Sequence, residues 1–597
     1  CPSTGSRLLH SLSLPECGGR TVELREPSEG SREITHNKAY CVRDKHPCGY
    51  PIYPHISTIC LTNHPAAMVL SAPDDLDAPG TEIRRLMFEV IRSKGDDIFM
   101  IDGLEDVYVT YRELYQKASS IAIFLNKAEI GEGTVVGILS DVMIEANLFI
   151  TGVWFSGATF CPMNPVLKPD EIRQLLEVCG AKTIYCQNKY LDTLEAALAL
   201  EGAAIDVTVI SDSPSASCID INDIVNEDPA DFEVGEYDEH ESISHILFTS
   251  GTTGVPKGVM ISSYSAKYTA HRVELDTASF MCTSPFYWIS YIAVFVGVVC
   301  NGTTLIVPRT KYLPGTNDPD VTHLMKCIEK YKPRNWFTAP SVVLDMSNVG
   351  ANYDLSSLVR VGVGGSNLLP SQRQLVCDTL FQGRRILCNL YGATEIGVIT
   401  RWPPGEAPDH DSPRAASLGV LAPGMDLKVV DPTTGVELGA GEVGEFVVKS
   451  KSIMKGYINK DMPKRYTPDD WYHMGDLGWF DEDGYLYFSS RLKEIMKYRG
   501  IQIAPAEIEK VILLHPGVLE VCVVGRPHPI EGERPAAFVV RKSQDLNEQE
   551  LMDFVHERVV DSKKLRGGVF FVEEIPKSGV GKTLRRELVK IFNEMDA

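Results

Sequence analysis

The segment around which this chain is built reads Leu247-Phe248-Thr249-Ser250-Gly251-Thr252-Thr253-Gly254-Val255-Pro256-Lys257-Gly258-Val259-Met260. It begins on the apolar run Ile243 to Phe248, which predicts a buried strand. Glycines, hydroxyl residues and one lysine follow. Glycine lets the main chain approach an anion closely, hydroxyl and N–H groups donate hydrogen bonds, and lysine adds positive charge. The stretch therefore predicts a loop that grips a triphosphate.

Two other interpretations of this loop fit its composition less well. An ordinary strand-to-helix turn rarely needs so many hydroxyl groups. A Walker loop requires Gly-x-x-x-x-Gly-Lys-Ser/Thr, and that spacing does not occur here. Near the C-terminus, Pro576 to Thr583 imitates a Walker loop, but proline stands where the first glycine is required.

Length and charge limit what the chain does. A chain of 597 residues predicts two or more domains. Its net charge of −22 argues against nucleic acid as the main partner, because phosphate backbones need a basic face. The basic cluster Lys563 to Lys590 is a solvated face or a local dock for phosphates. The longest apolar run, Ile289 to Cys300, is too short to cross a bilayer and predicts a core helix.

The cysteines indicate the redox compartment of the protein, and the N-terminal stretch indicates where its folded part begins. The 15 cysteines are scattered without metal-ligand spacing, which is typical of small core residues in a reducing compartment. Residues 1–67 have no clear periodicity and no apolar signal-peptide centre. We expect them to be disordered or to lie outside the working protein, with a start at Met68.

From Thr81 onward, strand and helix patterns alternate. Thr110 to Glu113 is a capping box that opens a helix, and Val135 to Leu139 predicts a buried strand. A helix over Met143 to Phe155 follows, then a helix from Pro169 and a strand over Thr183 to Cys186. This alternation predicts parallel sheets covered by helices.

Later segments are shorter or less regular. Ser211 to Glu239 is polar and acidic and predicts an irregular approach to the phosphate loop. Val361 to Ser366 predicts a strand ending in glycines. Gly419 to Tyr457 predicts a small β-rich subdomain, and Asp481 to Tyr485 predicts a hairpin.

The phosphate-loop motif, Thr249 to Gly258, is similar to the signature of the AMP-forming adenylating superfamily. That superfamily contains acyl-CoA synthetases, 4-coumarate–CoA ligases, beetle luciferases and peptide-synthetase adenylation domains. Its other motifs follow in the expected order, from Leu86 to Lys590. The resemblance implies an α/β protein whose large N-terminal domain, residues 68–491, has two parallel-rich, helix-covered sheets and a small β subdomain. A small mobile α+β domain, residues 492–597, follows a hinge at Lys493.

The resemblance also implies a nucleotide site. Tyr391 is expected to stack on adenine, Asp476 to accept hydrogen bonds from the ribose hydroxyls, and Glu395 to help hold Mg²⁺, which prefers a carboxylate with phosphate oxygens and water. Leu390 stands where many relatives have glycine. The residues expected to bind ATP or AMP are Thr249, Ser250, Gly251, Thr252, Thr253, Gly254, Lys257, Gly364, Gly365, Tyr391, Gly392, Thr394, Asp476 and Arg491.

The C-terminal motifs carry the catalytic lysines of the resemblance. Lys582 is expected to bridge the acyl carboxylate and ATP during adenylation, with Thr394 on the α-phosphate. Lys497, Gly500 and Gln502 are expected to enter the site for the thiol reaction only after the small domain has turned. Ser490 departs from the family's usual glycine.

The acyl pocket departs from the commonest pattern. Tyr287 and Trp288 stand where luciferases and plant ligases usually carry histidine, and with Ser366 they predict an aromatic wall around an apolar acid, although two core aromatics are an alternative. Peptide-synthetase domains place an aspartate nearby. None occurs between Ser279 and Gly297, which argues against an amino acid substrate.

Together these features predict an ATP-, Mg²⁺- and CoA-dependent acid–thiol ligase acting on a fatty or aromatic acid through acyl-AMP. A luciferase-type monooxygenase, a carrier-protein-loading enzyme and a catalytically silent lipid-binding relative stay open as alternatives. We expect an intracellular protein, cytoplasmic or peroxisomal, although the chain ends Met595-Asp596-Ala597 without a Ser-Lys-Leu tag.

Overall fold

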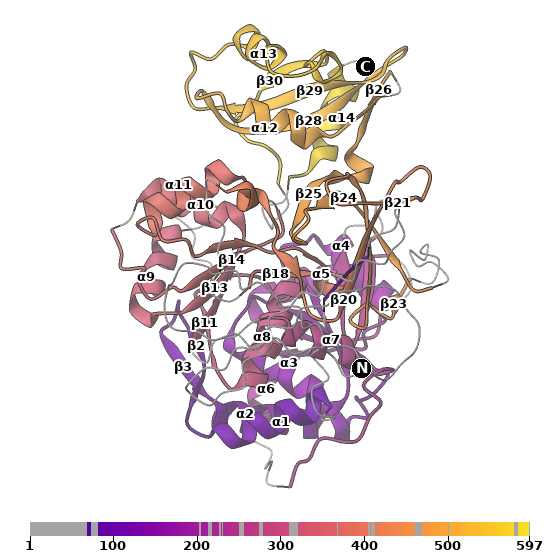
Figure 1. Ribbon diagram of the computed structural model, residues 1–597. Helices are drawn as coiled ribbons and strands as arrows, with labels where there is room; N and C mark the ends of the chain where they lie inside the picture. Colours follow the sequence, from indigo (N-terminus) through magenta and orange to yellow (C-terminus); the bar gives the residue numbers. More distant parts are fainter. Residues whose placement is uncertain are drawn as a thin grey trace, which may run out of the picture.

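The structure is a computed structural model of the 597-residue chain. The residues that it describes are 69–72, 82–201, 205–212, 218–225, 229, 231–249, 256–273, 279–309, 320–350, 352–366, 368–403, 406, 412–459, 469–499, 501–577 and 583–595. A large body carries two mainly parallel sheets and a third antiparallel sheet, and a small C-terminal domain stands on it (Figure 1).

The first large sheet has eight strands and contains the strand that leads into the phosphate motif. Its order is β23 (Gly456–Tyr457), β10 (Lys257–Ser262), β9 (Ile243–Thr249), β5 (Thr159–Met163), β4 (Val135–Leu139), β6 (Thr183–Cys186), β7 (Thr208–Ser211) and β8 (Ile219–Asp220). The strands from β9 to β8 pair in parallel, whereas β10 pairs antiparallel with both β9 and β23.

The second large sheet has seven strands. Its order is β15 (Leu387–Asn389), β14 (Arg360–Val363), β13 (Asn335–Thr338), β11 (Ser279–Cys282), β12 (Thr304–Val307), β2 (Ile98–Asp102) and β3 (Val107–Thr110). All pairs are parallel except β2 with β3. Neighbouring residues of one strand pack on opposite faces, as strand geometry requires. Met100 joins the core shared with the first sheet, and Ile101 joins the core on the outer face.

Helices fill the space between the two sheets and cover their outer faces. The shared core is formed with α1 (Ile83–Lys94), α2 (Tyr111–Lys127), α3 (Ile144–Ser156), α7 (Ser263–His271) and α8 (Ile289–Asn301). The outer faces are covered by α4 (Pro169–Cys179) and α5 (Leu191–Ala199) on the first sheet and by α9 (Val321–Tyr331), α10 (Pro340–Val349) and α11 (Pro370–Leu380) on the second. Helices α3 and α8 are apolar on nearly all sides because both are buried between layers.

A third, antiparallel sheet carries residues of the candidate site. Its strands are β1 (Leu70–Ser71), β20 (Met425–Val430), β22 (Gly444–Ser450), β24 (Tyr472–Phe480) and β25 (Leu486–Arg491), with β21 (Glu437–Leu438) beside β20. Two short antiparallel pairs of strands precede β20, β16 (Gly392–Ala393) with β17 (Gly397–Val398) and β18 (Thr400–Arg401) with β19 (Val420–Leu421).

The small domain begins after β25 and has its own core. Its sheet contains β27 (Ile501–Ile503), β26 (Met496–Tyr498), β29 (Gly532–Arg541) and β28 (Val518–His528), with β30 (Gly568–Phe571) parallel to β29. The helices are α12 (Pro505–Ile512), α13 (Glu548–His556) and α14 (Arg585–Met595). The domain packs α12 and α13 on one face of this sheet and α14 on the other, which gives two separate cores.

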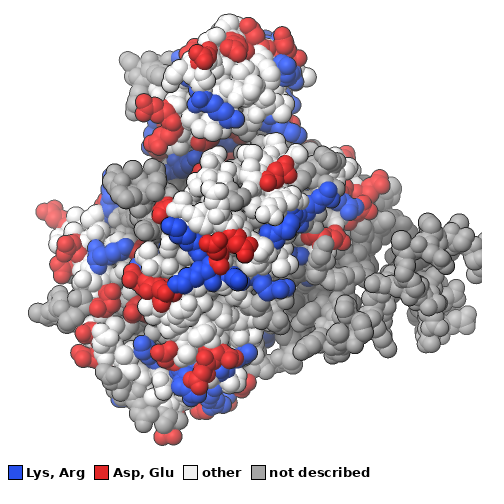
Figure 2. Space-filling model, turned by 90° about the vertical axis from the view of Figure 1, so that its left-hand side faces the viewer, with Lys and Arg blue, Asp and Glu red and all other residues white. Residues whose placement is uncertain are grey.

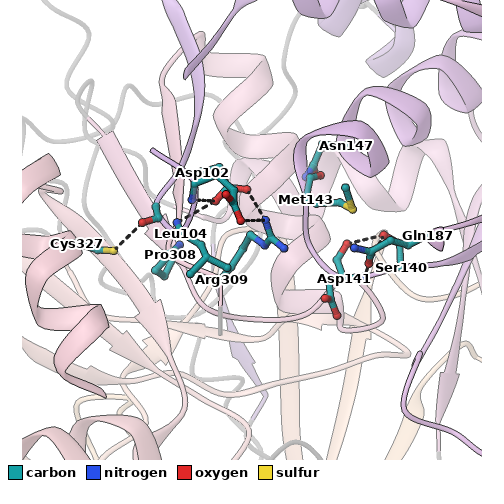
Figure 3. Close-up of polar contacts among 12 residues, drawn as sticks. Asp102, Leu104, Ser140, Asp141, Met143, Asn147, Gln187, Pro308, Arg309 and Cys327 are labelled. Carbon is teal, nitrogen blue, oxygen red and sulfur yellow. Dashed lines mark hydrogen bonds and ion pairs between the residues drawn. The ribbon is translucent and has the colours of Figure 1, made fainter. Parts of the chain in front are cut away.

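Polar contacts fix the ends of several strands, as Figure 3 shows. Asp102 closes β2, and its Oδ1 accepts bonds from the N–H of Leu104 (2.9 Å) and Glu105 (3.1 Å). Its Oδ2 accepts from Arg309 Nη1 at 3.1 Å. After β4, the N–H of Asp141 donates to Gln187 Oε1 at 3.1 Å. These bonds satisfy backbone groups where the chain leaves each sheet.

The elements predicted from periodicity are confirmed closely. The capping box at Thr110 and Glu113 is present, and strand β4 has the predicted bounds. The helix predicted over Met143 to Phe155 is α3, displaced by one residue at each end. Ser211 to Glu239 is less irregular than predicted, since β8 and the one-turn helix α6 (Ile221–Ile224) lie within it. The expectation for residues 1–67 lies outside the described residues.

Surface features agree with the composition. On the face seen in Figure 2, lysines and arginines are interspersed with aspartates and glutamates over both domains. Within the described ranges, no helix has the length and apolar character needed to cross a membrane. The cysteines of those ranges are free thiols and most are buried, as predicted for core residues.

Candidate active site

The phosphate motif spans two neighbouring antiparallel strands. Strand β9 ends at Thr249 and β10 begins at Lys257, and these two residues are direct partners in the sheet. Residues 250–255, with the predicted Ser250 to Gly254, lie outside the described residues. The segment therefore connects two strands of one hairpin, and Lys257 is buried at its base with 8% of its surface exposed.

A second part of the site joins Tyr391, Asp476 and Arg491. The Tyr391 hydroxyl donates to Asp476 Oδ2 at 2.7 Å, and Arg491 Nε lies 3.5 Å from Asp476 Oδ1. Asp476 and Arg491 face each other because they are paired in β24 and β25. Desolvation and the Asp476 carboxylate raise the pKa of Tyr391 well above its usual value. Tyr391 therefore stays protonated and acts as a donor.

Thr394 and Glu395 lie in the tight turn between β16 and β17. A Cβ on Gly392 would lie 2.5 Å from the carbonyl oxygen of Gly397, so only glycine fits this close approach. Hydrogen-bond donors from a later segment of the chain bind the carbonyl groups of this turn. The N–H of Met454 donates to the Glu395 carbonyl at 2.8 Å, and Ser452 Oγ donates to that of Ile396 at 2.8 Å.

Arg272 supports the same turn, and sequence reasoning missed it. The residue is 2% exposed, at the end of α7. Its Nη1 donates to Ser452 Oγ at 2.5 Å, and its Nε donates to the Pro423 carbonyl at 2.8 Å. A lone arginine after a helix gives no signal in one sequence. Its importance arises from the carbonyl groups that the fold collects around it.

Tyr457 is a second residue that sequence reasoning missed. Its hydroxyl donates to Glu395 Oε1 at 3.1 Å, and Lys257 Nζ lies 5.2 Å from the centre of its ring. Strand β23 places it there, because Val259 of β10 is the partner of Tyr457. The ring thus connects the phosphate motif to the carboxylate expected to hold Mg²⁺.

Of the residues predicted for the acyl pocket, Trp288 lies beside the loop that follows β14. Trp288 precedes α8, and its Cζ3 lies 4.0 Å from where a Cβ on Gly365 would stand. Gly365 has φ +91°, a conformation that favours glycine. A Cβ on Gly364 would lie 3.0 Å from Phe337 Cζ. Tyr287 is half-buried and Ser366 is exposed.

Leu390 replaces the glycine common in the superfamily, and the structure shows how it fits. A Cβ at Gly362 would lie 2.8 Å from Leu390 Cδ1, so the leucine occupies space that glycine leaves open. The ring of Phe337 closes the same space, 3.3 Å from that Cβ position. The substitution is therefore accommodated by small neighbours on β14.

The hinge and thiol-reaction residues lie in the small domain and at its root. Lys493 is in the 3₁₀ turn Leu492–Glu494 between β25 and β26. Lys497 is exposed on β26, and its N–H donates to Glu533 Oε2 at 2.9 Å. Gln502 belongs to β27, without a described side chain, and Gly500 lies outside the described residues.

Lys582 also lies outside the described residues, but both flanks of its segment are placed. Lys577 and Thr583 pair across the segment. Arg585, not singled out from the sequence, donates from Nη2 to Glu509 Oε2 at 3.0 Å and from Nε to Glu494 Oε2 at 3.1 Å. Glu494 adjoins Lys493, so the chain that follows the Lys582 segment is bonded close to the hinge.

The residues around Glu395 fit a magnesium–nucleotide substrate. In the described part of the chain, no group of three or more His, Cys, Asp or Glu side chains is arranged to hold a metal ion. Glu395 is half-buried in a turn beside Thr394. One carboxylate suits Mg²⁺ that arrives with phosphate oxygens and water as its other ligands. Asp476 offers two acceptor oxygens, which suits a pair of ribose hydroxyls.

Comparison with known proteins identifies the family of the chain. The family model described as AMP-binding enzyme matches residues 87–458, and the model of its C-terminal domain matches residues 507–582. Peroxisomal OPC-8:0-CoA ligase 1 of Arabidopsis thaliana is 31% identical over 513 residues, which cover 83% of this chain and 90% of that protein. 4-Coumarate–CoA ligase 2 of Petroselinum crispum is 31% identical over 516 residues, 84% of this chain and 92% of that protein.

Solved structures share the fold. ATP-bound MatB from Rhodopseudomonas palustris superposes with a TM-score of 0.75 at 21% identity, covering 86% of this chain and 100% of that one. The anthranilate CoA ligase AuaEII in complex with anthranoyl-AMP gives a TM-score of 0.74 at 22% identity, covering 86% and 98%. The α/β fold predicted from the sequence is confirmed. The two family models, which together match most of both domains, show that the chain belongs to the family of AMP-binding enzymes and is an enzyme of the AMP-forming acyl-CoA ligase type.

Proposed function

We propose that this enzyme joins an apolar carboxylic acid, fatty or aromatic, to coenzyme A through an acyl-AMP intermediate, releasing AMP and pyrophosphate. The observation that carries the proposal is the convergence of two groups of residues on one region. Tyr391, Asp476 and Arg491 are bonded together, and Tyr457 links Lys257 to Glu395. The first group suits a nucleoside and the second suits its phosphates.

The nucleoside end is assigned to the first group. Asp476 accepts hydrogen bonds from the ribose hydroxyls, and Arg491, whose Nε lies 3.5 Å from Oδ1, orients that carboxylate. Tyr391 offers its ring to adenine, while its hydroxyl stays on Asp476. The glycines Gly364 and Gly365 allow main chain to approach the base and the acyl group, because a side chain there would meet Phe337 or Trp288.

The first half-reaction is an in-line displacement. An oxygen of the substrate carboxylate bonds to the α-phosphorus of ATP, and the bond from that phosphorus to the bridging oxygen breaks, so pyrophosphate leaves. Negative charge spreads over the phosphoryl oxygens, and fixed donors and cations stabilise it. We assign this role to Thr394, Lys257, Lys582 and the hydroxyl and N–H groups of residues 249–254. Glu395 would hold the Mg²⁺ that arrives with ATP, and this ion would supply further charge neutralisation on the phosphates.

The second half-reaction follows a change of domain position. The thiolate of CoA attacks the acyl carbonyl carbon, the bond to the AMP oxygen breaks, and AMP leaves as the acyl-CoA forms. We propose that residues 492–597 rotate on residues 68–491 at Lys493, so that Lys582 withdraws and Lys497, Gly500 and Gln502 approach. Closure steps of this kind often limit turnover.

The acid is proposed to be apolar because of its surroundings. Trp288 lies beside Gly365, with Tyr287 next to it in the chain, so aromatic side chains border this region. Aromatic side chains with few polar groups suit a fatty or aromatic chain. The compartment is also part of the proposal, either cytoplasmic or peroxisomal, and the relative from Arabidopsis thaliana is named as peroxisomal.

A coupled pyrophosphate assay with carboxylic acids of graded length, with and without CoA, tests the proposal. We expect pyrophosphate release with a subset of apolar acids, faster turnover when CoA is present, and one AMP per acyl-CoA. Luciferin with ATP and oxygen is the control for a light-emitting reaction. If the purified enzyme consumes no ATP with any acid, the proposed function is wrong.

A further inference from the structure

The candidate site contains a chain of hydroxyl contacts that ends on Glu395. The Tyr457 hydroxyl lies 3.1 Å from Glu395 Oε1 and 3.4 Å from the Tyr472 hydroxyl. Tyr472 is 2% exposed at the start of β24, the strand that also carries Asp476. A strand of the third sheet and one of the eight-stranded sheet therefore meet at the carboxylate through two tyrosines.

The number of protons available fixes which group donates in each of these two hydrogen bonds. A tyrosine hydroxyl has one proton to donate, and an ionised carboxylate only accepts. Tyr457 therefore gives its proton to Glu395, and Tyr472 donates to the oxygen of Tyr457. A donor that is itself an acceptor is polarised, which strengthens its own hydrogen bond.

The other face of Tyr457 meets the phosphate motif. Lys257 Nζ lies 5.2 Å from the ring centre, within the range of a cation–π contact, and Lys257 is buried. One ring thus contacts the lysine of the phosphate motif and the carboxylate of the Thr394–Glu395 turn. Its place is fixed by the pairing of β23 with β10, so the ring sets the spacing between these two charged groups.

We propose that Tyr457 is a positioning residue that orients Glu395 toward the metal ion of the magnesium–nucleotide substrate. The inference rests on the proposed function. With Oε1 engaged by Tyr457, the carboxylate is fixed in rotation and keeps its other oxygen for a cation. Without the hydroxyl, Glu395 has to be ordered at the moment of binding, and the affinity for the magnesium form of ATP falls.

A purely structural role for Tyr457 makes a different prediction. A ring that only fills space would, when altered, weaken ATP binding with and without Mg²⁺ and slow both half-reactions together. A positioning role concerns the metal-bound form alone. It leaves metal-free ATP binding, and thioester formation from supplied acyl-AMP, close to the wild-type values.

The variant Tyr457→Phe removes the hydroxyl and keeps the ring over Lys257. We expect its affinity for ATP in excess Mg²⁺, measured by isothermal titration calorimetry, to fall roughly 5- to 20-fold. The affinity for ATP in the presence of a chelator should change less than about twofold. Affinities measured in the same way with Mg²⁺ and with chelator are sufficient to distinguish these two changes. Binding of Mn²⁺ with ATP, followed by electron paramagnetic resonance, should weaken in parallel.

Two control variants bracket the effect. Tyr472→Phe keeps the Tyr457–Glu395 hydrogen bond and removes only the hydroxyl that donates to Tyr457. Because this variant loses only the polarisation of Tyr457, we expect the affinity for ATP in Mg²⁺ to fall less than about threefold. Tyr487→Phe removes a comparable tyrosine–carboxylate bond, 2.9 Å to Asp481 Oδ2, outside this chain of contacts, and should change neither affinity.

The outcomes separate the inference from the proposed function. If the wild-type enzyme binds no ATP in Mg²⁺, the proposed function fails. If the wild type binds but Tyr457→Phe binds equally well in Mg²⁺, the positioning role is wrong. Equal losses with Mg²⁺ and with chelator, or a matching loss of thioester formation from acyl-AMP, also overturn it and assign Tyr457 a structural role.

Discussion

At the scale of single residues, the site depends on side chains that fix one another before any ligand arrives. Asp476 is 8% exposed and accepts from Tyr391 while Arg491 lies beside its other oxygen. Preformed polar contacts reduce the ordering that binding would otherwise require. The same principle applies to Glu395, which accepts from Tyr457.

Replacing Asp476 with asparagine tests the ribose assignment. The amide presents one acceptor oxygen in place of two and carries no charge, so we expect the KM for ATP to rise roughly 10- to 100-fold, the range for losing charge-assisted hydrogen bonds. Initial-rate kinetics with varied ATP measure this. Asp431→Asn is the matched control, because Asp431 accepts from turn N–H groups remote from the site. An unchanged KM for Asp476→Asn would contradict the assignment.

At the scale of elements, hairpins fix the positions of charged side chains. The hairpin of β16 and β17 brings Gly392 so close to Gly397 that a Cβ would lie 2.5 Å from a carbonyl oxygen. The hairpin of β28 and β29 carries Glu531, which is 6% exposed and is bonded by Arg534 Nε at 2.6 Å and Tyr498 at 3.1 Å. In both hairpins a local contact sets the position of a larger segment.

Gly392→Ala tests the first hairpin. The added methyl group forces β16 away from β17 and moves the turn that carries Thr394 and Glu395. We therefore expect acid-dependent pyrophosphate exchange to fall roughly 5- to 150-fold, the effect of an overpacking cost of about 1–3 kcal/mol. Gly235→Ala is the control, because a Cβ there would have no heavy atom within 4 Å. Equal exchange rates in both variants would show that the turn tolerates displacement.

Glu531 gives a pH-dependent prediction for the small domain. Hydrogen bonds from Arg534, and further bonds from Arg499 and Tyr498, lower the pKa of Glu531 to about 2. Because the folded pKa lies below the unfolded one, its stabilisation is fully present above the unfolded value and is lost as the pH falls toward about 2. We therefore expect Glu531→Gln to lower the melting temperature at pH 7, with a difference from wild type that shrinks below pH of about 4.5.

The control for Glu531 is Glu557→Gln. Glu557 pairs with Arg558 on the surface, where its side chain is 74% exposed, so its contribution is small at any pH. Thermal melts of the three proteins across the acid range measure the effect. A difference for Glu531→Gln that is constant down to the lowest pH would contradict the assigned ionisation.

At the scale of the whole molecule, two domains with separate cores share one reaction. The small domain has its own apolar clusters on both faces of its sheet, so it can move as a unit. Arg585 bonds to Glu509 and Glu494 beside Lys493, so the root of the Lys582 segment is anchored close to the hinge. Lys497 and the chain on both sides of the Lys582 segment thus belong to the same small domain.

This organisation predicts that the two half-reactions respond oppositely to two substitutions. Lys582→Ala should lower pyrophosphate exchange by about 100-fold or more and spare thioester formation from supplied acyl-AMP, because a positioned charge is needed only for the first step. Lys497→Ala should do the reverse. Single-turnover assays of each half-reaction measure both. Equal loss of both steps in either variant would contradict the two-position scheme.

By itself the sequence determined the family, the order of the motifs and most local elements. Strand β4 and the capped helix α2 follow from apolar periodicity and from the Thr110–Glu113 box, which are local properties. The small elements within 219–224 escaped prediction, because two-residue strands and one-turn helices have too few residues to show a period. Only tertiary structure decided that Tyr457 stands between Lys257 and Glu395 and that Arg272 supports the turn. Those contacts are set by strand pairing between distant segments, which no local pattern encodes.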